Sequence, residues 1–433
     1  MKLKQNKFLT STILLIFSGM ATKILGLIIK VIFTRIVGTT TISLYTLVMP
    51  TYSLLLTIST LAMPTTIAKL IAEKNDTRVL NNALIIIVVL NALLIIGMFF
   101  LSPFIANNLL KEPDAYYLLI AMSLTLPFAS IACILKGYYY GKQKMLPHVI
   151  SNTVEQIIRL IIVITIIPLL IQKSYVHAAT GLILTSLATE FASVVVFLSF
   201  MKKHDVINFT KINFNKQNTK DILDLSIPSV MSKIVGNICY FFEPIILTNI
   251  LLYKGFSNSY IITQYGAYNA YAISTLTIPS FFVSAISLAL VPEATKFLAQ
   301  KNYPTLKKRL KQAFIFTFII GLSSSFFVFI FRDVLLMLLY NTTLGSDFIR
   351  ILAPFFILFY FESVFASFMQ SIGKTNITFK ITIIASIIKL ITLALFSFLN
   401  LGIYALLISE IINIIFVVCS NYLYLKSYLD KLN

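Results

Sequence analysis

Charged residues are scarce in this sequence, and their scarcity excludes most classes of soluble protein. Of the 433 residues, 12% are Asp, Glu, Lys or Arg, 58% are hydrophobic, and the mean hydropathy is +0.90. Soluble globular domains contain roughly 25% charged residues. The composition therefore indicates a chain that is embedded mostly in a membrane.

Cysteine and histidine are also sparse. The three cysteines lie far apart in apolar runs, so they offer neither a disulfide framework nor a metal-ligand spacing: Cys133, Cys239 and Cys419. The three histidines are equally scattered: His148, His177 and His204. We therefore predict no metal site.

Signatures of enzymatic chemistry are missing as well. The sequence contains no Walker A loop, which excludes an intrinsic ATPase of that kind. Asp221 and Asp224 come nearest to the acidic pair of a sugar-nucleotide glycosyltransferase, but they do not form that motif. We predict no catalytic residues and no cofactor, and leave open whether membrane potential, protons or sodium drive the protein.

Long apolar runs recur along the whole chain. About 20 such residues in a helix cross the roughly 30 Å of hydrocarbon in a bilayer, and these runs lack the alternation of barrel strands. Internal prolines such as Pro279 predict bends. We predict an all-α integral membrane protein with about twelve transmembrane helices, at 8–37, 42–72, 82–105, 115–139, 147–171, 178–202, 222–252, 260–292, 307–331, 346–371, 377–398 and 401–426.

The net charge of +19 has a topological explanation. Loops on one side of the predicted helices contain 24 of the 35 basic residues, whereas loops on the other side contain Arg35, Lys111, Lys173, Lys254 and Arg332. Cytoplasmic loops are rich in Lys and Arg, where they also face anionic membrane lipid. Both termini are therefore predicted to be cytoplasmic, and no nucleic acid is expected as a partner. The N-terminal lysines and apolar run resemble a signal peptide, but we expect this segment to be retained as the first helix.

A polar stretch divides the chain into two halves with similar short sequences. We predict six-helix bundles at 1–203 and 221–433, joined by a cytoplasmic linker at 204–220. The matching segments are 23–26 with 233–236, 68–75 with 295–302, and 157–161 with 387–391. Because six is an even number, the halves are parallel repeats, and a substrate site is expected between them.

Polar stripes on the first helix of each half indicate that site. Lys23 and Lys30 share a narrow helical face with Gly19 and Gly26. Helix seven carries Ser229, Lys233, Asn237, Tyr240 and Glu243 at helical spacing. We predict a hydrated cationic cavity with the substrate-binding residues Lys23, Lys30, Arg35, Lys233, Asn237 and Tyr240. The alternative is that the lysines extend to lipid headgroups.

Other charges within helices are candidate gates or ion pairs. Glu155 and Arg159 have the spacing of a helical ion pair, which would act as a structural clamp or as a gate, and Glu243 joins them in this class. Three single acids either bind a coupling ion or pair with Lys389 or Arg350: Glu190, Glu362 and Glu410.

Three sequence stretches resemble a known family. Residues 135–147, LKGYYYGKQKMLP, together with 154–159, resemble the loop between helices four and five of polysaccharide exporters related to stage V sporulation protein B. Residues 23–38 and 44–73 resemble the same group. This group is a branch of the multidrug/oligosaccharidyl-lipid/polysaccharide superfamily that includes lipid II flippases. Members usually have two further C-terminal helices lining a groove for the lipid tail, whereas this chain is expected to end after twelve helices.

The resemblance implies export of undecaprenyl-pyrophosphate-linked saccharide by alternating access, in peptidoglycan or surface-polysaccharide synthesis. It also implies membrane lipid and cell-wall synthesis enzymes as partners. The lysines fit this substrate class because they would stabilise a pyrophosphate, and they would repel organic cations. We predict a flippase of the bacterial cytoplasmic membrane. The alternatives are a multidrug/cation antiporter of the same superfamily and a non-transporting scaffold in cell-wall or spore-cortex synthesis.

Overall fold

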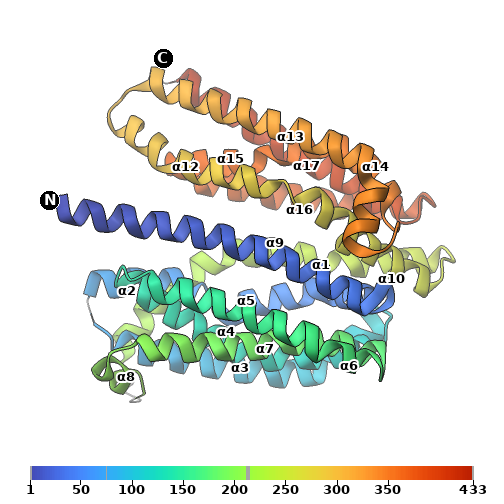
Figure 1. Cartoon of the computed structure of the whole chain (residues 1–433), viewed down its shortest axis with the longest axis horizontal. Helices are drawn as coiled ribbons and strands as arrows, with labels where there is room; N and C mark the ends of the chain where they lie inside the picture. Colours follow the sequence, from blue (N-terminus) through green and yellow to red (C-terminus); the bar gives the residue numbers. More distant parts are fainter. Residues whose placement is uncertain (1, 75, 211–214, 432–433) are drawn as a thin grey trace. The chain divides into compact units, whose positions relative to one another are not determined.

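The computed structural model describes residues 2–74, 76–210 and 215–431, and all regular elements in these ranges are helices (Figure 1). They form two compact units, Met1–Phe241 and Phe242–Asn433. The units divide within the helix α9 (Lys216–Tyr253), C-terminal to the linker expected at 204–220. Residues 211–214 of that linker lie outside the described residues.

The first unit is built around α4, which packs against α1, α2, α3 and α7. Three polar side chains fasten this core: Ser59 of α1 donates a hydrogen bond to Asn91 of α3 (2.8 Å) and lies 2.5 Å from the hydroxyl of Ser130 on α4. In a membrane such groups have no water to bond with, so they must satisfy one another. The helices are α1 (Lys2–Thr60), α2 (Met63–Lys74), α3 (Val79–Phe104), the π-helix η1 (Ile105–Leu109), α4 (Ala115–Gly141), α5 (Leu146–Thr165), α6 (Ile167–Ile171), α7 (Tyr175–Phe200), α8 (Lys203–Thr210) and the first part of α9.

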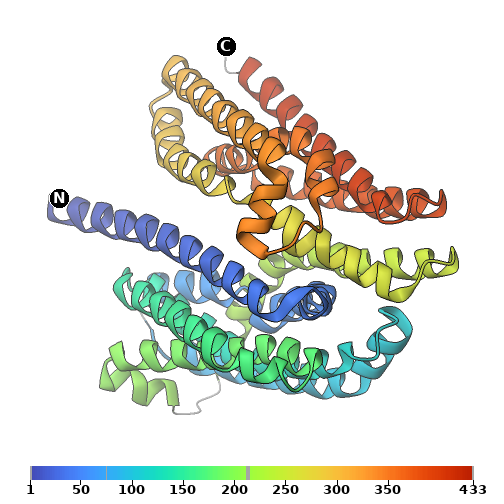
Figure 2. The ribbon, with the colours of Figure 1, turned by 45° about the vertical axis from the view of Figure 1, so that its right-hand side comes forward.

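The second unit contains the end of α9 and the helices that follow it, shown from yellow to red in Figure 2. Its main packed pairs are α16 with α17, α12 with α15, and α13 with α14. The helices are α10 (Asn258–Gly266), the π-helix η2 (Ala267–Ile273), α11 (Ser274–Thr277), α12 (Ser280–Ala299), α13 (Tyr303–Tyr340), α14 (Ser346–Phe359), α15 (Phe361–Ser371), α16 (Thr375–Phe398) and α17 (Tyr404–Asp430).

The ends of several helices follow from local sequence. Asn302 caps α13 by accepting a hydrogen bond from the backbone N–H of Thr305 (3.2 Å), and Asn341 ends it in a left-handed conformation with φ 57°. Ser174 caps α7 in the same way through the N–H of Val176. Gly345 has φ 90° where the chain enters α14, a conformation that glycine adopts without strain.

The number of spanning helices agrees with the prediction of about twelve, although two of the predicted helices are interrupted. Within the described residues, ten helices are long and apolar enough to cross a membrane, or eleven with one bent pair. The first of them, Ala21–Glu73, includes residues 21–37 of the first predicted helix and the whole of the second, 42–72. Each of the other predicted helices overlaps one of the remaining candidate spans or the bent pair.

The predicted boundary between the first two helices is confirmed at Gly38, whose non-helical angles (φ 72°, ψ 178°) divide α1 into two helices that meet at a kink. The predicted second helix, 42–72, is itself interrupted at Leu61 and Ala62, which have positive φ and separate α1 from α2. The predicted helix 260–292 is also broken. Asn258–Thr277 and Ser280–Ser287 meet at 52°, because Pro279 at this break cannot donate a backbone hydrogen bond.

Candidate functional site

The predicted cationic residues of the first helix all lie on α1. Lys23 and Arg35 are exposed, and Lys30 is half-buried. Near Gly26 the helix closely approaches α5, since a Cβ placed on this glycine would lie 3.9 Å from Gln156 Oε1. That oxygen is buried and accepts no hydrogen bond from the described residues. The face of α1 between the two lysines thus meets an unsatisfied polar atom.

The predicted residues of the seventh helix lie on α9. Asn237 donates a hydrogen bond from Nδ2 to Thr57 Oγ1 of α1 (2.6 Å), and Tyr240 is half-buried. Lys233 is exposed and stands at the start of the apolar span Lys233–Tyr253. The prediction placed Lys23 and Lys233 in opposite halves, whereas both lie in the first compact unit because that unit includes α9 up to Phe241.

Polar side chains also join α5 to α7 inside the first unit. Ser151 and Ser193 lie 2.6 Å apart, and Arg159 contacts Thr189 Oγ1 at 3.5 Å. Glu155 accepts a hydrogen bond from Ser151 (3.3 Å). The expected Glu155–Arg159 ion pair is not formed, because each side chain contacts a nearby hydroxyl group instead. Arg159 nevertheless links two helices, as a clamp would.

Glu190 lies in the same region of α7. It interacts electrostatically with both Glu155 and Arg159, and more weakly with Lys136 of α4. Two acids and two bases therefore share this partly buried region. The formal charges of these four side chains balance, so the region has no strong excess of either sign.

The second unit holds a buried charged triad, defined here as Glu243, Lys389 and Glu410. Lys389 Nζ lies 2.5 Å from Glu243 Oε2 and 2.6 Å from Glu410 Oε2. The side chain of Glu243 is only 3% exposed, that of Glu410 13% and that of Lys389 18%. The three residues come from α9, α16 and α17, so the triad joins α9 to two consecutive helices that follow it much later in the sequence.

Further polar groups surround this triad. Tyr265 donates a hydrogen bond to Glu243 Oε1 (3.3 Å), and Tyr268 interacts electrostatically with Lys389. Glu362 of α15 lies within electrostatic reach of Glu410. The sequence analysis named Lys389 as one possible partner for Glu190, Glu362 or Glu410. In the structure Glu410 forms an ion pair with it. It missed the two tyrosines, which no sequence pattern connects to the triad.

The motif LKGYYYGKQKMLP has a packing role in the structure. A Cβ on Gly137 would lie 2.8 Å from Ile67 Cβ, and one on Gly141 would lie 2.7 Å from Ile71 Cβ, so α4 and α2 touch at these glycines. The Tyr138 hydroxyl donates to Asp205 Oδ2 (2.6 Å) and that of Tyr139 to the carbonyl of Phe197 (2.7 Å). The motif thus fixes α4 against α2, α7 and α8.

Solved structures with this fold are membrane transporters. An inward-facing multidrug-resistance MATE family transporter of the MOP superfamily superposes with a TM-score of 0.72 at 18% identity, covering 95% of each chain. An outward-facing structure of such a transporter gives a TM-score of 0.64 at 16% identity and covers 98% of this chain and 96% of that one. The chain therefore has the fold of these MATE family structures.

Sequence comparison identifies the family. Residues 8–298 match the model of the polysaccharide biosynthesis protein family, and residues 244–395 match the MatE model. Stage V sporulation protein B of Bacillus subtilis (strain 168) is 30% identical over 394 residues, which cover 88% of this chain and 76% of that protein. Lipid II flippase MurJ of the same organism is 23% identical, covering 89% and 76%.

The chain belongs to the polysaccharide biosynthesis protein family. It is a transporter of the flippase branch of the multidrug/oligosaccharidyl-lipid/polysaccharide superfamily and not an enzyme. It lies in the bacterial plasma membrane as a multi-pass protein.

Proposed function

We propose that this transporter moves an undecaprenyl-pyrophosphate-linked saccharide across the plasma membrane by alternating access. The observation that carries the proposal is the placement of Lys23, Lys30 and Lys233 on the long apolar helices α1 and α9 of the first unit. Cations within transmembrane helices usually face a cavity or a substrate pathway. A pyrophosphate suits a pathway lined by lysines, since it accepts several charge-assisted hydrogen bonds.

The position of the lysines fits the first step of such transport. Under the predicted topology the N-terminus of α1 is cytoplasmic, and Lys233 begins its apolar span on the same side. A lipid-linked precursor made in the cytoplasm would meet these cations as it enters, together with Asn237 and Tyr240 of α9, and would meet the exposed Arg35 at the opposite end of the path. The names of the relatives, a lipid II flippase and a sporulation protein, support the same substrate class.

We further propose that the charged triad couples transport to an energy source, with membrane potential, protons and sodium as the candidates. Two carboxylates share one ammonium there. If Lys389 moved away, the pair Glu243 and Glu410 would attract a proton or a sodium ion because two adjacent carboxylates repel each other. Dissipating each gradient separately in cells, with ionophores of different selectivity, identifies the one that transport requires.

A multidrug/cation antiporter is the second candidate function, favoured by the MATE structural neighbours and the MatE match. Against it, the buried carboxylates of the triad already bind Lys389, so an organic cation would have to displace that lysine. The lysines of α1 and α9 would also repel it.

Depletion of the protein in cells separates the candidates. The flippase proposal predicts that lipid-linked precursor accumulates on the inner face of the plasma membrane, while efflux of cationic dyes stays unchanged. Unchanged precursor with reduced dye efflux would replace the proposal by the antiporter. If neither changes while assembly of cell-wall enzymes is lost, the protein is a scaffold.

A further inference from the structure

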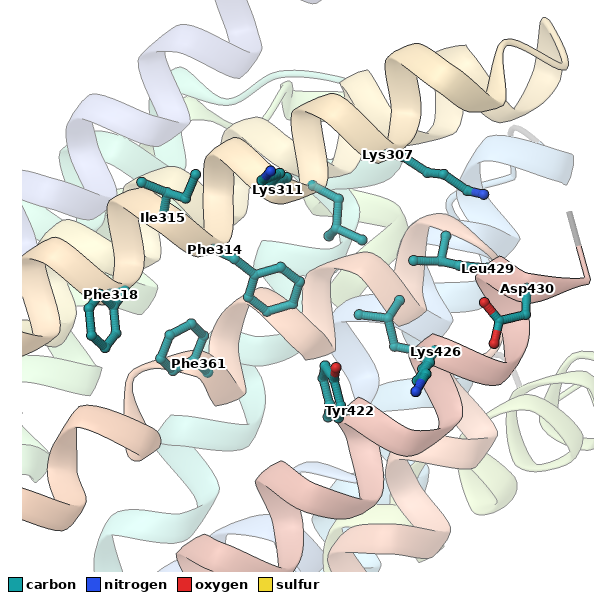
Figure 3. Close-up of a pocket in the computed structure, with 12 residues that line it drawn as sticks. Lys307, Lys311, Phe314, Ile315, Phe318, Phe361, Tyr422, Lys426, Leu429 and Asp430 are labelled. Atoms are coloured by element: carbon teal, nitrogen blue, oxygen red, sulfur yellow. The ribbon is translucent and has the colours of Figure 1, made fainter. Parts of the chain in front are cut away.

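A pocket of about 510 Å³ opens between α13, α15 and α17 in the second unit (Figure 3). Its lining combines lysines with aromatic and aliphatic side chains. The lining residues are Lys307, Leu310, Lys311, Phe314, Ile315, Phe318, Phe361, Tyr422, Leu425, Lys426, Leu429 and Asp430.

The helix periods explain why these residues meet. On α13, Lys307, Lys311 and Phe318 repeat at intervals of four and seven residues, which places them on one face of the helix. On α17, Tyr422 and Lys426 are four residues apart and likewise share a face. Each helix therefore presents a stripe that is cationic toward one end and apolar toward the other.

The apolar part of the pocket is lined by packed side chains and is exposed at one end. Phe314 points from α13 into the pocket and stacks on Phe361 of α15, with ring centroids 5.7 Å apart (Figure 3). Leu310 and Leu425 are buried beneath it, at 2% and 3% exposure. Phe318 remains 49% exposed at the far end. An apolar molecule can thus lie against this wall from the side of the membrane.

The other part of the pocket is cationic. Lys307, Lys311 and Lys426 line it, against the single acid Asp430. Within the described residues 2–74, 76–210 and 215–431, no carboxylate oxygen lies within 4.0 Å of the ammonium nitrogen of Lys311 or of Lys426. Lys311 and Lys426 therefore give the pocket a positive charge that no ion pair with a described carboxylate neutralises.

The two parts of the pocket follow one another along the axes of α13 and α17. The lysines belong to the first turns of α13, which begins at Tyr303, and the last turns of α17, which ends at Asp430. Phe318 lies seven residues beyond Lys311, about 10 Å deeper along the helix at 1.5 Å per residue. A cationic rim above an apolar wall matches a lipid with an anionic headgroup.

We propose that this pocket binds an anionic glycerophospholipid, with its phosphodiester between Lys311 and Lys426 and an acyl chain along Phe314, Ile315 and Phe318. Charge complementarity selects the headgroup, because a zwitterionic lipid brings its own cation to the lysines. The site uses neither the lysines of α1 and α9 nor the charged triad. It therefore goes beyond the transport proposal and does not depend on it.

Native mass spectrometry of the purified full-length protein tests this site with three lipid probes, phosphatidylglycerol, phosphatidylcholine and a polyprenyl phosphate. The wild type is expected to retain phosphatidylglycerol in preference to the other two. The double variant Lys311→Gln/Lys426→Gln should weaken phosphatidylglycerol binding by about a hundredfold or more, since each of the two charge-assisted contacts contributes about 1.5–3 kcal/mol, roughly tenfold to a hundredfold in affinity. The matched control Lys308→Gln/Lys374→Gln removes two exposed lysines outside the pocket and should bind like the wild type.

A second variant distinguishes a bound lipid from a bound phosphate group alone. Ile315→Trp fills the apolar part at a 46% exposed position and leaves the lysines in place. It should also lose phosphatidylglycerol. Equal binding of both lipids by the wild type, wild-type binding by the double lysine variant, unchanged binding by Ile315→Trp, or retention of polyprenyl phosphate in place of phosphatidylglycerol would each overturn the proposal.

Discussion

At the scale of single residues, Lys389 illustrates what a charge inside a membrane helix requires. Its ammonium contacts two carboxylates, Glu243 and Glu410, and Tyr265 donates a further hydrogen bond to the first of them. Removing one member of a buried ion network leaves the others uncompensated, which costs about 3–5 kcal/mol. Replacing all members by neutral groups costs far less.

This asymmetry gives a stability prediction. Lys389→Met should strongly lower the thermal unfolding midpoint of the purified protein, because it leaves two buried carboxylates facing each other. The triple variant Glu243→Gln/Lys389→Met/Glu410→Gln should recover most of the loss. Lys380→Met, on the exposed side of the same helix α16, is the matched control and should unfold like the wild type. Equal midpoints for Lys389→Met and Lys380→Met would show that the triad contributes nothing to the fold.

The lysines of the first unit give a functional prediction. Lys23→Ala and Lys233→Ala should each impair transport about tenfold to a hundredfold, as expected for the loss of one charge-assisted contact to a pyrophosphate. Lys23→Arg should be milder because the charge remains. Complementation of a depleted strain, with protein abundance measured alongside, is the assay.

Lys220→Ala is the control for this prediction, since it lies in the polar first turns of α9 and is exposed. It should complement fully. If both alanine variants of the functional pair also complement fully at normal abundance, the two lysines reach lipid headgroups and bind no substrate.

At the scale of helices, Gly137 and Gly141 set how closely α4 approaches α2. A methyl group at either position would lie less than 3 Å from Ile67 or Ile71, with the carbonyls of Pro64 and Ala68 equally near. We predict that Gly137→Ala and Gly141→Ala each destabilise the protein by about 1–3 kcal/mol, the usual cost of overpacking. Gly97→Ala on α3 meets open space and should be neutral or slightly stabilising. Thermal unfolding in one detergent compares the three.

Helix positions were predictable because hydropathy alone determines which segments cross a bilayer. Breaks within the helices were harder to predict from the sequence. The break at Pro279 and the end of α1 at Leu61 and Ala62, just before Pro64, both lie at prolines, but a proline alone does not tell whether a helix bends or ends. The predicted end of helix 307–331 coincides with the kink at Phe331, beyond which α13 continues to Tyr340.

The candidate site was predictable only in its parts. The sequence identified Glu243, Lys389 and Glu410 as charges that need partners, yet their pairing depends on how the distant helix α9 packs against α16 and α17. At Glu155 and Arg159 the helical spacing predicted an ion pair that does not form. Glu155 instead accepts a hydrogen bond from Ser151, and Arg159 contacts Thr189. Spacing specifies which residues share a face, and packing decides what they contact.

At the scale of the whole molecule, the distribution of basic residues predicts that both termini and the 202–220 loop are cytoplasmic. In a variant lacking the three native cysteines, Lys216→Cys should resist a membrane-impermeant thiol reagent in intact cells and react after lysis. Lys173→Cys, exposed between α6 and α7 on the opposite side, should react in intact cells. Labelling of Lys216→Cys from outside would reverse the proposed orientation.

The proposed substrate class is tested most directly in liposomes that contain the purified protein and undecaprenyl-pyrophosphate-linked saccharide, with an impermeant saccharide-binding probe added outside. Protein-containing liposomes should expose to the probe the precursor that began on the inner leaflet, whereas protein-free liposomes should not. The Lys23→Ala/Lys233→Ala protein should expose it much more slowly than the wild type. Movement at the same rate with and without the protein, over a range of pH, sodium concentration and membrane potential, would contradict the account.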